Sequence, residues 1–211
     1  MMYMHDRYLF ISAHPDDSEL SAGGLIHKLV RLGKEVRILI LSNPVISLPE
    51  GFEGNVLIKE QEQAAACLGV ALNNIRFCDF PVRRFSEHRQ DILETFVEVN
   101  NQFNPDVIVT SHPQDIHQDH AQVGQEASRA FKKKNLLFYE APWNGAPSSN
   151  NLSIALEAED IDAKQAAISC YKSQQHRIYS SPDFLSGWAK MRGAVVDEEF
   201  AEVFEVQCLR F

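Results

Sequence analysis

The sequence lacks a hydrophobic run long enough to cross a membrane, since no stretch approaches the roughly 20 apolar residues that a spanning helix needs. It also lacks, at its start, a charged segment followed by the apolar stretch of a signal peptide. We therefore expect a cytoplasmic protein without a membrane span.

Positive charge is also scarce. The chain of 211 residues has 20 lysines and arginines against 29 aspartates and glutamates, which gives a net charge of −9, and its one basic cluster is Lys132–Lys134. Proteins that bind nucleic acid present clustered basic residues to the phosphates. We therefore expect no nucleic-acid partner.

Cysteine is sparse and dispersed. No two cysteines have the spacing of a zinc knuckle or a redox pair, and each has apolar neighbours. We interpret all four as reduced core residues: Cys67, Cys78, Cys170 and Cys208. The length and the 45% hydrophobic content suit one domain, residues 1–211, that buries its core without disulfides.

Short apolar runs alternate with segments of helical periodicity over the first two thirds of the chain. The pattern predicts buried strands at 8–11, 36–41, 75–78, 107–110 and 136–139, and helices near 25–32, 57–68, 92–103 and 118–131. This alternation indicates an α/β fold, a Rossmann-like three-layer sandwich with a mostly parallel sheet. The last third is less regular, and we expect it to complete the site. It predicts a strand at 152–156, helices at 160–171 and 184–191, and a half-exposed strand at 204–208.

Two polar segments follow predicted strands. The first, Ala13–Glu19, has a histidine and adjacent aspartates before a glycine pair, and the second, Ser111–His120, has three histidines and two aspartates. Ligands of open parallel sheets bind outside the carboxyl ends of the strands. We therefore expect the two segments to form one site.

The residue types in these segments suit a metal ion. Three imidazole and carboxylate ligands with an open position for water are typical of catalytic zinc. We predict that His14, Asp17 and His120 bind one zinc ion per chain. Zinc lowers the pKa of its bound water to about 7, and Asp16 could take the proton as general base.

The remaining polar residues have roles in the same chemistry. His117 could stabilise the oxyanion of a tetrahedral intermediate as an imidazolium. Either Asp119 or Asp115 could hold that ring in its charged form. Together these residues predict metal-assisted hydrolysis of an amide or ester.

The same residues carry a family resemblance. Ala13–Glu19 with Gly23–Gly24, and Asp115–His120, resemble the two signature motifs of the PIG-L/LmbE-like zinc deacetylases, in order and in placement after strands. The resemblance implies hydrolysis of an N-acetyl group from an amino sugar, often N-acetylglucosamine in a glycoconjugate, a lipid-linked sugar or a thiol precursor. It implies zinc on His14, Asp17 and His120, Asp16 as base, His117 at the oxyanion and Asp119 supporting His117.

The substrate contacts are predicted less directly. The chain has Ser42–Pro44 where many members have a threonine and a glycine, and Lys59 where an arginine that helps to hold the substrate is common. These departures leave the acceptor sugar unassigned. By location alone, Arg83 with Arg84 could bind a phosphate or carboxylate, and Trp143 could stack on a sugar. Gln174, Arg177 and Tyr179 could cover the pocket.

Other functions remain as alternatives. Carboxylates and histidines also build the two-metal sites of esterases and phosphoesterases. A catalytically inactive metal-binding module or a nucleotide-binding Rossmann domain would share the fold, although the glycine fingerprint of dinucleotide-binding proteins is missing. The sequence leaves open the native metal and the oligomeric state, a homo-oligomer included.

Overall fold

The structure, a computed structural model, describes residues 5–42, 55–145 and 149–210. Across these residues seven strands form one sheet in the order β3-β2-β1-β4-β5-β7-β6. The strands are β1 (Arg7–Ser12), β2 (Glu35–Ile40), β3 (Ile75–Phe77), β4 (Val107–Thr110), β5 (Asn135–Tyr139), β6 (Leu152–Leu156) and β7 (Phe200–Cys208). The first five are parallel, and β7 runs antiparallel between β5 and β6.

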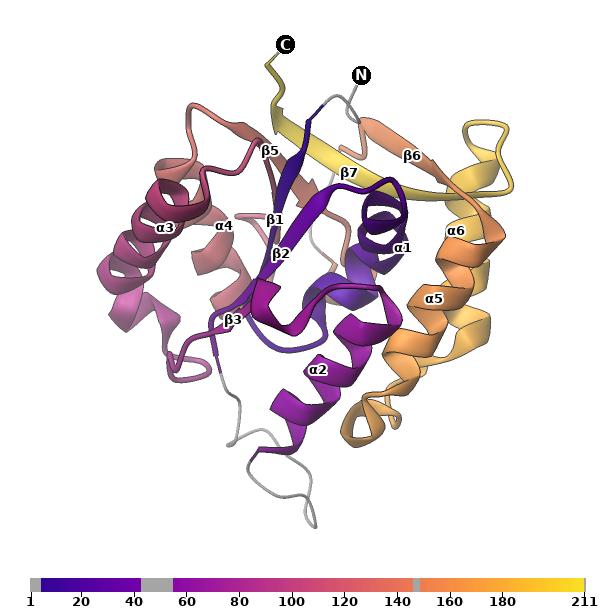
Figure 1. Cartoon of the computed structure of the whole chain (residues 1–211), viewed down its shortest axis with the longest axis horizontal. Helices are drawn as coiled ribbons and strands as arrows, with labels where there is room; N and C mark the ends of the chain where they lie inside the picture. Colours follow the sequence, from indigo (N-terminus) through magenta and orange to yellow (C-terminus); the bar gives the residue numbers. More distant parts are fainter. Residues whose placement is uncertain (1–4, 43–54, 146–148, 211) are drawn as a thin grey trace.

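Helices cover both faces of this sheet (Figure 1). They are α1 (Asp17–Arg31), α2 (Val56–Cys67), α3 (Arg89–Phe103), α4 (Gln118–Ala130), α5 (Ala158–Ser169) and α6 (Pro182–Ala194). Successive strand residues point to opposite faces. Tyr8 and Phe10 therefore join the core under α1, α2, α5 and α6, whereas Leu9 and Ile11 join the core under α3 and α4. The predicted three-layer α/β sandwich with a mostly parallel sheet is confirmed, and its bounds at 1–211 stay a prediction.

Two parts of the chain differ from the prediction in the bounds of their elements. Helix α1 begins at Asp17, well before the apolar repeat that predicted it, because its first turn is polar and buried in the site. The last third contains two strands and two full helices. Strand β7 begins at Phe200, and its first five residues are buried, so that only its end is half-exposed as expected. The predicted turn region at 43–54 lies outside the described residues.

Helix α1 is interrupted in its middle. Ala22 has φ −141° and ψ 20°, which breaks the helical hydrogen bonds. The amides of Gly24 and Leu25 instead donate to the Glu202 carboxylate of β7, at 3.0 and 2.8 Å. Glu202 also accepts from Lys164 Nζ at 2.7 Å, and both side chains are buried. A carboxylate from the last strand thus caps the second half of the first helix.

The glycine pair in α1 follows from this packing. A Cβ on Gly23 would lie 2.9 Å from Cγ of Lys164, and a Cβ on Gly24 would lie 2.5 Å from Cδ1 of Leu156. Both distances are shorter than van der Waals contact allows. The pair therefore allows α5, β6 and β7 to approach the helix closely.

The cysteines differ from the expectation. All four are free, but Cys67 is exposed and the other three are half-buried, so the prediction of core residues was wrong. Cys67 at the end of α2 and Cys170 after α5 place their sulfur atoms 3.7 Å apart, although they are far apart in sequence.

None of the described helices is both long and apolar enough to cross a membrane. The cytoplasmic location stays a prediction.

Candidate metal centre

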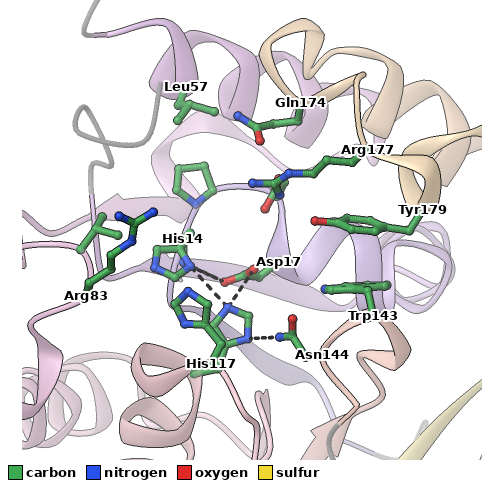
Figure 2. Close-up of a pocket in the computed structure, with 14 residues that line it drawn as sticks. His14, Asp17, Leu57, Arg83, His117, Trp143, Asn144, Gln174, Arg177 and Tyr179 are labelled. Carbon is green, nitrogen blue, oxygen red and sulfur yellow. Dashed lines mark hydrogen bonds and ion pairs between the residues drawn. The ribbon is translucent and has the colours of Figure 1, made fainter. Parts of the chain in front are cut away.

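The two polar segments meet at the point in the sheet where the strand order reverses, between β1 and β4. β1 and β4 are parallel neighbours, and the chain leaves β1 toward α1 on one face and β4 toward α4 on the other. Such a switch point opens a crevice at the carboxyl ends of the strands. His14 lies in the turn after β1 and Asp17 begins α1, while His117 caps α4 and His120 lies in its first turn. Figure 2 shows the side chains of His14, Asp17 and His117 converging.

Polar atoms of three side chains surround one point. His120 Nε2 lies 3.3 Å from His14 Nδ1 and 3.3 Å from Asp17 Oδ1, and His14 Nδ1 lies 3.7 Å from Asp17 Oδ2. Zinc bonds of about 2.0–2.1 Å in a tetrahedral site place ligand atoms about 3.3–3.4 Å apart. The donor set and its spacing therefore fit a zinc ion.

Each of these two imidazoles contacts a carboxylate with its other nitrogen. His14 Nε2 lies 3.1 Å from Asp119 Oδ2, and His120 Nδ1 lies 3.2 Å from Asp115 Oδ2. Asn144 Nδ2 donates to the same Asp115 oxygen at 3.0 Å. Metal-binding histidines commonly have such partners, which fix the ring and make it more basic.

His117 lies beside the same point. Ring nitrogens of His14, His117 and His120 all come within 4.8 Å of one another, so the three histidines form a second possible ligand set. We favour Asp17 over His117 as the third ligand because its oxygens lie at 3.3 and 3.7 Å from the two other ligand atoms. His117 then lines the pocket next to the ion site.

The environment of His117 differs from the expectation. The Asp119 carboxylate, expected to hold this ring, contacts His14 instead, because residues two apart on a helix point in different directions. His117 Nδ1 accepts from the Asp119 backbone amide at 3.3 Å, and the His117 amide donates to Asp115 Oδ1 at 2.8 Å. Burial, together with the charges of His120 and His14, lowers the pKa of His117. The lowered pKa favours the neutral imidazole over the expected imidazolium, and the bond from the Asp119 amide to Nδ1 favours the tautomer with its proton on Nε2.

Asp16 has a strained backbone and a buried carboxylate. Its φ of 87° lies in the left-handed region, which costs a residue with a side chain about 1–3 kcal/mol. Its amide donates to Gln61 Oε1 at 3.3 Å, and Arg177 Nη1 lies 3.3 Å from its Oδ2. Burial raises the pKa of Asp16 well above its usual value; the charge of Asp17 adds to this and Arg177 opposes it.

The ion-site residues strongly shift one another's pKa values in the metal-free chain. Burial alone would lower the pKa of His120, but Asp17 and Asp115 outweigh it and raise this pKa to about 10. Burial would raise the pKa values of Asp17 and Asp115. The charge of His120 and its hydrogen bonds to these carboxylates outweigh burial, so both pKa values lie below their usual value. The site is thus prepared for positive charge.

A pocket of about 230 Å³ lies over these residues. Beyond the motif residues it is lined by Leu57, Val82, Arg83, Trp143, Asn144, Gln174, Arg177 and Tyr179. The last third of the chain contributes much of this lining, as expected.

The predicted substrate contacts fall into two groups. Arg83, Trp143 and Gln174 line the pocket, whereas Lys59 is exposed on α2 and is not among the described residues that line it. The Trp143 ring stacks on the Tyr179 ring with centroids 4.7 Å apart. The Trp188 ring packs against the same indole in a T-shaped arrangement, with centroids 5.7 Å apart, so Trp143 belongs to an aromatic cluster and its face toward Tyr179 is covered.

Sequence reasoning missed the role of Gln61. Its oxygen accepts from the Asp16 amide and from the Tyr171 hydroxyl, the latter at 2.7 Å, so it fixes the strained turn. The available signal was its position: Gln61 lies on the face of α2 that also carries Ala64 and Ala65, and a polar residue on an apolar face needs a partner.

Asn144 was missed as well. It lies in the loop after β5 and contacts both Asp115 and His120. No feature of the sequence distinguishes it from other polar loop residues. Only the assembled fold places it in the site.

Comparison with known proteins agrees with this architecture. A family model described as PIG-L, GlcNAc-PI de-N-acetylase, matches residues 9–131. The protein named "Uncharacterized deacetylase YaiS" from Escherichia coli K12 is 25% identical over 171 residues, which cover 78% of this chain and 90% of that protein.

Two solved structures have the same fold. The N,N′-diacetylchitobiose deacetylase from Pyrococcus horikoshii, in complex with its inhibitor MPG, has a TM-score of 0.75 at 19% identity, with 96% of this chain and 84% of that chain covered. GalB, the 4-carboxy-2-hydroxymuconate hydratase from Pseudomonas putida KT2440, has a TM-score of 0.79 at 18% identity, with 98% of each chain covered. At these identities the likeness establishes the fold alone. Because the family model spans more than half of the sequence and includes both polar segments, the chain belongs to the PIG-L family of GlcNAc-PI de-N-acetylases.

Proposed function

We propose that this chain is a zinc-dependent deacetylase that removes the N-acetyl group from an amino sugar or sugar conjugate of the N-acetylglucosamine type. The observation that carries the proposal is the convergence of His14 Nδ1, His120 Nε2 and the Asp17 carboxylate. Its membership of a deacetylase family supports the reaction type. The name of the P. horikoshii relative, a diacetylchitobiose deacetylase, supports an N-acetylated sugar as the substrate.

His14, Asp17 and His120 would hold the ion, and Asp115 and Asp119 would orient the two imidazoles. When bound, zinc supplies Lewis-acid chemistry, since it lowers the pKa of a coordinated water and polarises a carbonyl oxygen.

The reaction itself needs a base and an oxyanion donor. Asp16 accepts the proton of the attacking water, and its raised pKa suits a base that works near neutral pH. As the oxygen–carbon bond forms, negative charge collects on the amide oxygen, where His117 donates a hydrogen bond from Nε2. Asp16 then gives the proton to the leaving nitrogen while the carbon–nitrogen bond breaks. The products are acetate and a free amine.

The test is acetate release from N-acetylglucosamine and N,N′-diacetylchitobiose, with bound zinc measured by mass spectrometry. Asp16→Asn should retain zinc and lose at least about 100-fold in kcat, the usual contribution of a general base. Asparagine tolerates the left-handed backbone of this turn. The matched control is Asp197→Asn, since Asp197 also has a positive φ, 59°, but is exposed on the surface.

The alternatives predict other results. An esterase or phosphoesterase with a two-metal site would bind two ions per chain and would prefer p-nitrophenyl acetate or p-nitrophenyl phosphate. An inactive module would bind zinc without turnover of any substrate. Wild-type turnover in Asp16→Asn would show that the proposed base is wrong.

A further inference from the structure

Asp119, a residue of the candidate metal centre, and its neighbour Gln118 hold the backbone of Arg83. Its φ of 66° lies in the left-handed region. Its amide donates to Asp119 Oδ2 at 2.6 Å, and its carbonyl accepts from the side chain of Gln118. The same Asp119 oxygen contacts His14 Nε2. One carboxylate therefore holds both a proposed metal ligand and the turn that presents Arg83.

The Arg83 side chain lines the pocket without a carboxylate partner among the described residues. The two other arginines near it are both paired. Arg83 and Arg84 are both exposed, but Arg84 lies 2.6 Å from Glu87, and Arg177 lies 3.3 Å from Asp16. Arginine has a planar fork of donors that matches phosphate and carboxylate groups. Of the arginines that line the pocket in the described part of the chain, Arg83 is thus the one without a carboxylate partner there.

The position of Arg83 gives the pocket two chemically different walls. Figure 2 shows Arg83 on one side of the histidine cluster and Trp143 with Tyr179 on the other. The chain carries a net charge of −9, so the positive charge of Arg83 is opposite in sign to that of the protein as a whole. A substrate could place its acetamido group at the histidines while a second group extends toward Arg83.

We propose that Arg83 binds an anionic group, a phosphate or a carboxylate, on the N-acetylated substrate, and so selects acidic sugars over neutral ones. The inference rests on the proposed deacetylase function for the identity of the sugar. Charge-assisted hydrogen bonds from a guanidinium to such a group support a preference of about 10- to 100-fold.

The experiment compares three sugars in four proteins. N-acetylglucosamine 1-phosphate tests a phosphate, N-acetylmuramic acid tests a carboxylate, and methyl N-acetylglucosaminide is the neutral reference. The proteins are the wild type, Arg83→Gln, Arg83→Lys and the control Arg84→Gln. The readouts are kcat/KM for acetate release from the zinc-loaded protein and, independently, the dissociation constant of each sugar by NMR titration of chelator-treated protein.

We expect Arg83→Gln to lower the ratio of anionic to neutral kcat/KM, and the ratio of binding constants, by about 10- to 100-fold. Arg83→Lys should lie between it and the wild type because lysine keeps the charge without the fork. Arg84→Gln should behave as the wild type. Whichever acidic sugar shows the effect identifies the anionic group as phosphate or carboxylate.

Three results would overturn the proposal. The first is equal ratios in Arg83→Gln and Arg84→Gln, and the second is an equal loss for neutral and acidic sugars. The third is a wild type that binds acidic sugars no better than neutral ones. If the wild type released no acetate from any sugar, the proposed function would fail, and the binding ratios would still decide the role of Arg83.

Discussion

Binding of zinc to the metal-free protein should release a proton from His120. A metal ligand must be a neutral imidazole, yet Asp17 and Asp115 keep the His120 ring charged, with its pKa raised to about 10. We therefore expect about one proton to leave for each zinc ion bound at pH 7.

The size of the effect follows from this pKa. With a pKa of about 10, roughly one site in a thousand has a neutral His120 at pH 7, so the apparent zinc affinity is about 1,000-fold below that of the deprotonated site. The proton is held below this pKa and lost above it. The apparent affinity should therefore rise with pH, about tenfold per unit between pH 7 and 9, and fall as the solution becomes acidic.

Isothermal titration calorimetry of chelator-treated protein in two buffers of different ionisation enthalpy counts the released protons. His112→Gln is a suitable control, because His112 is a buried histidine that contacts Glu205 rather than the ion-site residues, and it should leave the count unchanged. His120→Gln should bind zinc weakly. A count near zero at pH 7 would refute the reasoning, since it would mean that His120 is already neutral in the empty site.

Three further predictions concern other contacts. Asp119→Asn should lower zinc affinity about 10- to 100-fold in competition with a fluorescent chelator, because it weakens the partner of a metal ligand, and an unchanged affinity would contradict that role. Glu202→Gln should lower the free energy of unfolding by about 3–5 kcal/mol in urea titrations, since it leaves the buried charge of Lys164 without its carboxylate; a loss below about 1 kcal/mol would count against the pair. Diamide should oxidise Cys67 and Cys170, whose sulfurs lie 3.7 Å apart, to a disulfide visible as a cross-linked peptide in mass spectrometry, whereas Cys67→Ser should yield none.

Most of the fold could be predicted from local patterns in the sequence. Continuous apolar runs predicted the parallel strands, because strands covered on both faces have no exposed side. The position of β7 between β5 and β6 could not be predicted in this way, because pairing between strands that lie more than 40 residues apart leaves no local pattern in the sequence. The polar first turn of α1 was missed because its side chains are buried against the site rather than in an apolar core.

The candidate site was predicted in its residue types and less well in its contacts. The sequence predicted that His14 and His120 lie in one site, because each follows the end of a buried strand, and these two strands are parallel neighbours in the structure. The partner of Asp119 depends on which way a helical side chain points, and the loop after β3 that it also contacts lies far away in sequence. Such contacts become visible only once the chain has folded.

The capping of α1 by Glu202 has a consequence for synthesis on the ribosome. A nascent chain that has emerged as far as α4 already contains His14, Asp17 and His120, but it lacks the carboxylate that satisfies the amides of Gly24 and Leu25. The first helix can therefore reach its final form only after the seventh strand leaves the exit tunnel, so the two ends of this domain must both be available before its first helix is complete.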